Sequence, residues 1–281
     1  MAVLLVSVSH GVAAAQHVRV TVENDAIALR ERLRAEDRDY SSGLRLEWLR
    51  GDRLRVAIGQ EIYTPRIDDA RPVPGERPYA ALLYGEVGMA AAATDTRGPQ
   101  GFSIAVGVVG PGAFGEPIQN GIHELTGMAT EEGWDRQLRL GAIVQARYRD
   151  GLRIPLSADS RVTVGPFTEF TVGSLRLATT AGTALHLGSG AAESVPYGRG
   201  FGASLSAAAV WKPWDALLDS DSWFTDTLDR RRVFARFESA VGYRMSHWTI
   251  SYRLVVVGRE YPSQPGSHAY GSLSLAWHPE R

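Results

Sequence analysis

Apolar and polar residues alternate along most of this chain, in stretches of about ten residues. The segment 18–23 reads Val-Arg-Val-Thr-Val-Glu, and the segment 138–148 alternates in the same way. Because successive side chains of a strand point to opposite faces, each stretch has one apolar face and one polar face. The length of the stretches, with charges opposite Leu, Val, Trp and Tyr, is typical of a barrel that is apolar outside and polar inside.

Twelve such stretches predict twelve strands, an even number as in bacterial single-chain barrels. They are expected near residues 17–24, 42–50, 53–61, 79–92, 100–110, 136–149, 160–172, 178–188, 201–211, 231–245, 247–258 and 270–278. The sequence therefore predicts an all-β, transmembrane, antiparallel β-barrel.

The connections between these strands alternate in length. Strands two and three, and strands ten and eleven, are joined by short polar turns, whereas the long segments are 25–41, 62–78, 111–135, 212–230 and 259–269. In outer-membrane barrels long loops face outside and short turns face the periplasm. We therefore expect long extracellular loops, some of them helical; segments 173–177 and 189–200 depart from the alternation.

Two side-chain patterns in the second half of the chain agree with a membrane barrel. Trp211, Tyr243 and Trp248 lie near strand ends, as an interfacial aromatic girdle requires. Charged residues, which are costly against lipid but acceptable in a polar lumen, are expected on the inner face: Arg139, Arg236, Glu238, Arg244 and Arg253.

The composition of the chain excludes several kinds of partner and chemistry. A formal net charge of −1 over 281 residues offers no electrostatic case for a nucleic-acid partner. The absence of cysteine excludes disulfides, thiolate zinc sites and cysteine nucleophiles. Residues 1–15 are apolar and small and end in three alanines, which predicts a signal peptide ahead of a barrel over 16–281, although the usual basic start is missing. An ordinary first strand is the alternative for 1–15.

Four groups of reactive side chains fall at one rim of the predicted barrel. Asn24 and Asp25 end the first strand, and Ser41 opens the second. Arg77 precedes the fourth strand, and the segment 119–123, with Gln119 and His123, follows the fifth. A carboxylate, a hydroxyl, amides and an imidazole at the extracellular membrane boundary favour a site for a lipid substrate.

Seven motifs in order resemble the family of LpxR-type outer-membrane lipid A 3′-O-deacylases. They are 23–25 (Glu-Asn-Asp), 39–45 (Asp-Tyr-Ser-Ser-Gly-Leu-Arg), 59–65 (Gly-Gln-Glu-Ile-Tyr-Thr-Pro), 76–80 (Glu-Arg-Pro-Tyr-Ala), 107–111 (Gly-Val-Val-Gly-Pro), 119–123 (Gln-Asn-Gly-Ile-His) and 133–137 (Gly-Trp-Asp-Arg-Gln). The resemblance covers about residues 20 to 190. Ser41 stands where the family usually has threonine, and the family's acidic residue after the histidine aligns with either Glu131 or Glu132.

The resemblance implies a monomeric barrel in the bacterial outer membrane. Its substrate would be the lipid A of lipopolysaccharide, and it would hydrolyse the 3′ ester and release the acyloxyacyl group. The resemblance further implies Ca²⁺ as cofactor and a histidine as base.

Carried onto this chain, His123 would take a proton from the attacking water. Asp25 and Asn24 would offer the oxygen ligands that Ca²⁺ prefers. The Ser41 hydroxyl would hydrogen-bond to substrate or cation. Gln119 would share a helical face with His123, and Arg77 would pair with a phosphate of lipid A.

Each of these residues has a plainer alternative, and so does the whole chain. Asn24-Asp25 and the 41–43 segment also fit turns or caps, His123 fits a loop histidine, and Arg77 fits an ion pair in the lumen. A non-enzymatic outer-membrane barrel, either a narrow channel or a structural protein, is the second functional hypothesis. A soluble barrel that binds an apolar ligand is the third, and it would require the apolar face to point inward.

Overall fold

The structure is a computed structural model, and it describes residues 16–28, 39–50, 54–66, 75–91, 96–188, 200–219 and 229–279. The predicted signal peptide 1–15, the turn at 51–53 and the segment 189–199 lie outside the described residues.

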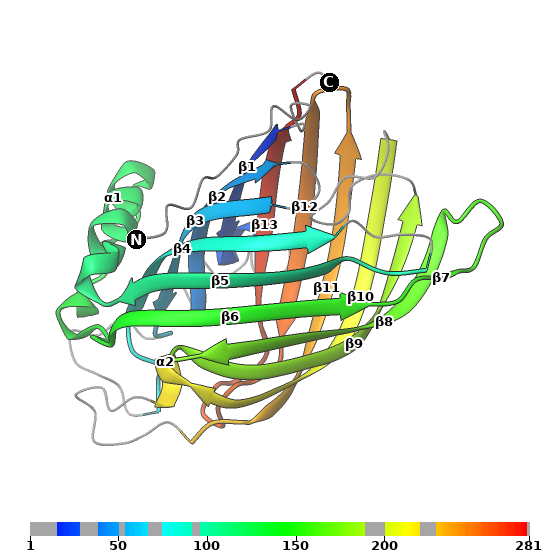
Figure 1. Cartoon of the computed structure of the whole chain (residues 1–281). Helices are drawn as coiled ribbons and strands as arrows, with labels where there is room; N and C mark the ends of the chain where they lie inside the picture. Colours follow the sequence, from blue (N-terminus) through cyan, green and yellow to red (C-terminus); the bar gives the residue numbers. More distant parts are fainter. Residues whose placement is uncertain are drawn as a thin grey trace, which may run out of the picture.

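Twelve long antiparallel strands form a closed barrel (Figure 1). They are β1 (Gln16–Asn24), β2 (Asp39–Arg50), β3 (Leu54–Thr64), β4 (Ala80–Ala91), β5 (Gln100–Val109), β6 (Gly141–Gly151), β8 (Val162–Gly173), β9 (Arg176–Gly188), β10 (Gly200–Asp215), β11 (Val233–Arg244), β12 (Trp248–Val257) and β13 (His268–Trp277). Strands pair in chain order, and the ring closes where β1 pairs with β13. The two-residue strand β7 (Ile154–Pro155) pairs only with β8, beside the direct β6–β8 ladder. All twelve predicted strands are present.

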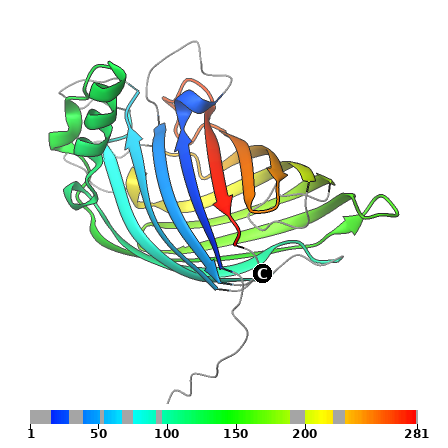
Figure 2. The ribbon, with the colours of Figure 1, turned by 90° about the horizontal axis from the view of Figure 1, so that it is seen from above.

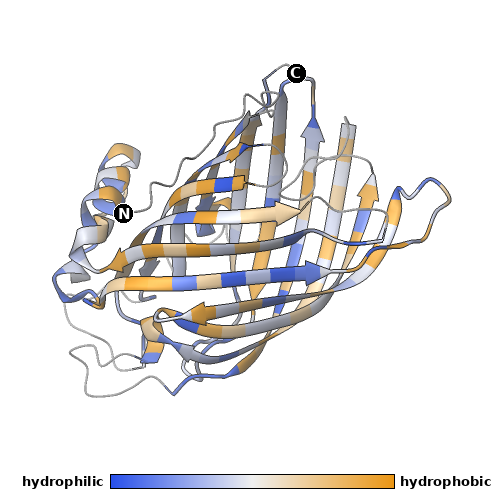
Figure 3. Cartoon of the chain, viewed as in Figure 1, coloured by the Kyte–Doolittle hydropathy of each residue, from blue (hydrophilic) through white to orange (hydrophobic). Residues whose placement is uncertain are grey.

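The outer face of the barrel is apolar. In the register, Val22 lies opposite Leu44, and Leu46 lies opposite Ile58, and all four side chains are exposed. Hydrophobic and hydrophilic residues follow one another along β3 to β6 (Figure 3). Aromatic side chains predicted for a girdle, Trp211, Tyr243 and Trp248, are exposed on this face near strand ends. An exposed apolar band between aromatic belts is the lipid-facing surface of a membrane barrel.

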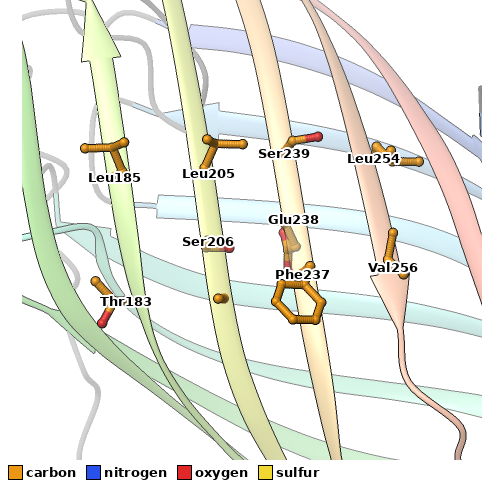
Figure 4. Close-up of a pocket in the computed structure, with 10 residues that line it drawn as sticks. Thr183, Leu185, Leu205, Ser206, Phe237, Glu238, Ser239, Leu254 and Val256 are labelled. Carbon is orange, nitrogen blue, oxygen red and sulfur yellow. The ribbon is translucent and has the colours of Figure 1, made fainter. Parts of the chain in front are cut away.

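A shallow apolar depression interrupts this band over β9 to β12 (Figure 4). It arises where the small side chain of Ala207 lies among larger neighbours, which include Leu185, Leu205, Phe237 and Leu254. The depression belongs to the lipid-facing surface.

The inner face carries paired charges. Arg45 bonds to Glu86 at 2.8 Å, and Arg253 bonds to Glu23 at 2.6 Å. The predicted lumen residues Arg236 and Glu238 pair at 2.8 Å. Because successive side chains of a strand point to opposite faces, these pairs lie on the inner face, away from the exposed apolar side chains of the same strands.

One end of the lumen is filled by side chains. An apolar cluster of Tyr40, Tyr63, Leu82, Leu138 and Leu217 occupies it, together with Ala80, Val109, Ile143, Leu175 and Ala216. Beside the cluster, Lys212 bonds to Asp215 and, at 2.5 Å, to Glu260. Burial alone would raise the pKa of Glu260, but the Lys212 ammonium lowers that pKa to about 2.

The helical segments all lie at this same end, whereas β7 lies at the opposite end (Figure 1). They are η1 (Asp25–Ile27), η2 (Pro111–Ala113), α1 (Gly115–Thr126), η3 (Gly133–Arg136) and α2 (Ala216–Asp219). The prediction that some long loops are helical is therefore confirmed. None of the described helices is long and apolar enough to cross a membrane.

One strand begins later than predicted. The alternation indicated a strand from residue 136, but β6 begins at Gly141. Residues 133–136 form η3 instead, and Gly141 has a φ of 74°, which interrupts an extended backbone. Arg139, predicted in the lumen, lies ahead of the strand and is exposed, with Nη2 donating to the Asp135 carbonyl.

Replacing Ile104, exposed in the middle of β5, by arginine tests whether lipid surrounds the outer face. A charge at the centre of the hydrocarbon should lower the free energy of unfolding by about 2–4 kcal/mol. Urea unfolding in phospholipid vesicles measures it, with Ile104→Leu as the conservative control. An arginine variant as stable as the leucine variant would contradict a lipid-facing β5.

Candidate active site

Helix α1 is attached to the outside of the barrel wall. The side chains of Gln60 and Ala81 belong to the outward rows of β3 and β4, in line with the exposed Ile58 and Val87. Gln60 Nε2 donates to the Ala113 carbonyl at 2.6 Å, immediately before α1. The first residue of α1 is glycine, and any Cβ there would lie 2.5 Å from Trp134 and collide with Ala81. The sequence therefore allows the helix to approach the wall closely.

His123 is buried on the wall side of α1, with 4% of its surface exposed. Its Nδ1 lies 2.5 Å from the Ala129 carbonyl oxygen. Because a carbonyl only accepts, Nδ1 donates, and in the neutral ring the lone pair then belongs to Nε2. Ala129 comes back beside His123 because the chain turns at the end of α1, where Gly127 adopts a φ of 73° and Met128 N donates to the His123 carbonyl at 2.8 Å. This arrangement fixes the tautomer that a general base needs.

Gln119 lies one turn before His123 and is also buried. Its Oε1 accepts a hydrogen bond from Trp134 Nε1 at 3.1 Å. Trp134 packs against Tyr79 with ring centroids 5.0 Å apart, and both belong to an apolar cluster with Ile62, Ala81 and Ala113. The predicted pairing of Gln119 and His123 on one helical face is therefore present in the structure.

Glu131, one of the two acidic residues after the histidine, is held beside α1. Tyr79 donates to Glu131 Oε2 at 2.7 Å. The Asn120 side chain bonds to both backbone groups of Glu131, accepting from N at 2.9 Å and donating to O at 3.2 Å. Glu132 is exposed. Tyr79, Asn120 and Trp134 were not predicted as site residues, although each lies inside one of the quoted motifs.

The second part of the site is η1, which holds Asp25. Asn24 caps this turn, because its Oδ1 accepts from Ala26 N at 2.8 Å and its Nδ2 donates to the Ser41 carbonyl at 3.0 Å. Asp25 is buried, and its Oδ1 accepts from the same Ala26 N at 2.8 Å. The Asn24 and Asp25 oxygens therefore lie side by side around one amide. The plainer interpretation of Asn24 as a cap is also correct in part.

Like α1, η1 lies on the outside of the barrel. Tyr252, in the outward row of β12 with Ile250, donates to the Ile27 carbonyl at 3.1 Å. Gly271 belongs to the outward row of β13, with Leu273. A Cβ on Gly271 would lie 2.7 Å from the backbone of Ile27, so only glycine allows this close contact. Figure 2 shows η1 (blue) and α1 (green) at the same end of the barrel.

The wall between η1 and α1 is made by the ends of β1 to β4. In the register Asn24 lies opposite Ser42, Ser42 opposite Ile62 and Ile62 opposite Ala81, all in outward rows. Three strand spacings separate Asn24 from Ala81, so the distance between these two residues across the sheet is about 15 Å. The start of η1 and the start of α1, where Gly115 approaches Ala81, therefore flank a strip of outer wall at one rim.

Ser41 and Arg77 are placed differently from the other predicted residues. Ser41 sits at an irregularity of β2 between Tyr40 and Ser42, is buried, and hydrogen-bonds through Oγ to Thr64 Oγ1. Arg77 has 4% of its surface exposed, lies 4.5 Å from the ring centroid of Tyr63, and is 4.0 Å from Asp39. These contacts agree with the alternative of an arginine paired inside the barrel. Contact of Ser41 or Arg77 with a substrate remains a prediction.

Within the described residues, no group of three or more histidine, aspartate and glutamate side chains is arranged to hold a metal ion. The adjacent oxygens of Asn24 and Asp25 are the right donor type for calcium, which takes six to eight oxygen ligands. A calcium ion at η1 would therefore need backbone carbonyls and water to complete its shell.

The closed twelve-stranded sheet, its apolar outer band and a rim site on the exterior define an outer-membrane β-barrel protein. The sequence matches, over residues 1–279, the family described as "Outer membrane protein LpxR". The chain belongs to this family, and its location is the bacterial outer membrane.

A solved structure supports this fold. The protein is similar to LpxR from Salmonella typhimurium, with a TM-score of 0.77 and 18% identity, covering 93% of this chain and 99% of that one. It also resembles the translocator domain of the autotransporter NalP from Neisseria meningitidis, with a TM-score of 0.48 and 9% identity over 95% and 89% of the two chains. No curated protein sequence matches the chain.

Changing Trp134 to phenylalanine removes the indole N–H, and with it the hydrogen bond that Gln119 Oε1 accepts. Losing one buried hydrogen bond should destabilise the attachment of α1 by about 1 kcal/mol. The α1 amides should then exchange with deuterium faster while the strand amides do not, as followed by mass spectrometry. Trp211→Phe, at an exposed position of β10, is the control. Unchanged exchange in α1 would show that Trp134 does not hold the helix through this bond.

Proposed function

We propose that this protein is a lipid A 3′-O-deacylase that uses Ca²⁺ and His123 to hydrolyse the 3′ ester of lipid A in the outer leaflet. Family membership supports a lipid A deacylase, and one observation carries the finer proposal. A buried histidine with a fixed tautomer lies outside the barrel, at the edge of the lipid-facing band. A lipid that stays in the membrane can reach such a position.

In this mechanism, His123 Nε2 takes a proton from water as the water oxygen bonds to the ester carbonyl carbon. Donation from Nδ1 to the Ala129 carbonyl orients the ring and stabilises the imidazolium that forms. The proton then passes to the 3′ oxygen of the sugar as the bond from that oxygen to the carbonyl carbon breaks. The products are the free acyloxyacyl acid and a 3′ hydroxyl.

Asp25 and Asn24 would hold the cation. Their oxygens already lie side by side at η1, and a hard cation accepts this donor type. Bound Ca²⁺ would supply positive charge to stabilise the developing oxyanion. Ser41 would contribute by accepting from Asn24 through its carbonyl, and thus by setting the position of the amide.

Gln119 and Arg77 have supporting roles in this proposal. Gln119 is held by Trp134 on the same helical face as His123, where its amide would orient the water or the ester. Arg77 contacts Tyr63 and Asp39 beneath the rim, so a phosphate of lipid A would have to approach the mouth to meet it. The filled mouth also weighs against the alternative of an open channel.

His123→Ala should abolish release of the 3′ acyloxyacyl group, because this variant lacks the Nε2 that accepts the proton of the attacking water in the proposed mechanism. Mass spectrometry of lipid A from cells that express each variant measures this release. His186→Ala, on β9 away from the rim, is the matched control and should keep full activity. Equal release by wild type and His123→Ala, with both folded as judged by heat-modifiable migration, would refute the role of the histidine.

Calcium binding can be measured without activity. Terbium luminescence of the purified, folded protein should report a site that Ca²⁺ competes for and that Asp25→Asn weakens at least about tenfold, because a carboxylate ligand becomes neutral. Asp159→Asn, in the exposed turn before β8, should bind like wild type. Equal terbium binding by Asp25→Asn and wild type would contradict a cation site at η1.

A further inference from the structure

Helix α1 has an apolar face that the protein leaves uncovered. Ile118, Ile122 and Leu125 are exposed over 41%, 49% and 89% of their surface. Their spacing of four and three residues places them in one stripe along the helix. We call these three residues the α1 stripe.

The α1 stripe lies beside the wall-side face of the helix, which carries Gln119 and His123, and not opposite that face. Positions 115, 119 and 123 face the wall, and at 100° per residue the stripe is centred about a quarter turn away on one side. Glu116 and Glu124 are exposed on the other side. The helix therefore has three faces: one toward the wall, one apolar and one acidic.

The surroundings of the stripe indicate what covers it. α1 contacts the ends of β3 and β4, and the outward side chains Ile58 and Val87 on these strands are 54% and 56% exposed. This is the band that lipid covers in an outer-membrane barrel. Helix α1, which carries the stripe, therefore lies at the end of this band.

The direction of the helix fits the same environment. α1 runs across the ends of β4 to β6 instead of continuing along them (Figure 1). Since the strands cross the bilayer, the helix lies roughly in the membrane plane. A helix in this plane with one apolar face and one charged face is the geometry of an interfacial helix, whose apolar side sinks into the acyl chains.

We propose that α1 is an interfacial helix, with the α1 stripe immersed in the acyl chains of the outer leaflet and Glu116 and Glu124 in water. The wall-side face with His123 then lies at the depth where glycerol and sugar esters meet the chains. Lipid would enter sideways from the bilayer, and this last step rests on the function proposed above.

The depth of α1 can be measured directly, because the chain has no cysteine and single-cysteine variants are unambiguous. Nitroxide labels at Leu125→Cys and Ile118→Cys should, in phosphatidylethanolamine–phosphatidylglycerol vesicles, collide more with oxygen than with a water-soluble nickel chelate. Labels at Glu116→Cys and Glu124→Cys should show the reverse. Leu125 makes few contacts at 89% exposure, so this substitution does not endanger folding. A Leu125 label as accessible to nickel as the Glu124 label would overturn the proposal and favour a protein partner or bare solvent.

A second measurement tests sideways entry. Leu125→Asn should lower deacylation of lipid A in vesicles at least about fivefold, because an amide disfavours immersion. The same variant should keep wild-type activity on lipid A dispersed in detergent, and Glu124→Gln should be unchanged in both. Equal loss in vesicles and detergent would overturn sideways entry. If wild type deacylates nothing in either medium, the proposed function fails, and the label measurement still decides where α1 lies.

Discussion

The structure depends on one constraint: inside hydrocarbon, every backbone N–H and C=O must find a partner within the protein. A sheet meets it only by closing on itself, and here β1 pairs with β13 to complete the ring. Closure makes every strand present one face to lipid and one to the lumen. It also gathers alternate connections at one end. That is how η1, after the first strand, and α1, after the fifth, come to share a rim although about ninety residues separate them.

Both segments turn outward at that rim, so the predicted site residues that they carry lie outside the barrel and not in its lumen. Gly271 and Tyr252 contact η1 on the exterior, and Ala81 and Gln60 contact the start of α1 and the residue before it. The lumen beneath is filled by apolar side chains and by the Lys212–Glu260 pair. In the proposed function, a reacting lipid would meet His123 and Asp25 from the membrane side, whereas a channel would need an open lumen.

Most of the fold follows from the sequence because a strand repeats every two residues and its two faces meet different solvents. All twelve strands and the lumen charges at Arg236 and Glu238 were predictable for that reason. The start of β6 was not, since Leu138 and Leu140 continue the alternation through a segment that is no longer strand. A period-two pattern cannot show where a backbone such as that of Gly141 leaves the extended region.

The site was predictable as a set of residues and not as an arrangement. Asn24 and Asp25 lie at the end of the first strand, Gln119 and His123 lie in the loop after the fifth, and the topology brings both connections to one rim. The burial of Ser41 and Arg77 depends on a strand irregularity and on the packing of Tyr63, which leave no local signal. The contacts of Tyr79, Asn120 and Trp134 link residues 52, 11 and 15 positions apart, and no periodic pattern of the sequence indicates such pairs.

The central claim is that lipid A reaches a strip of outer wall between η1 and α1, and a photocrosslinker placed on that strip tests it most directly. Benzoylphenylalanine at Ser42, on the outward row between Asn24 and Ile62, should form an adduct with lipopolysaccharide in living cells. The same group at Thr21, on the inward row of β1, should form none. Adducts at Thr21 but not at Ser42 would contradict the account.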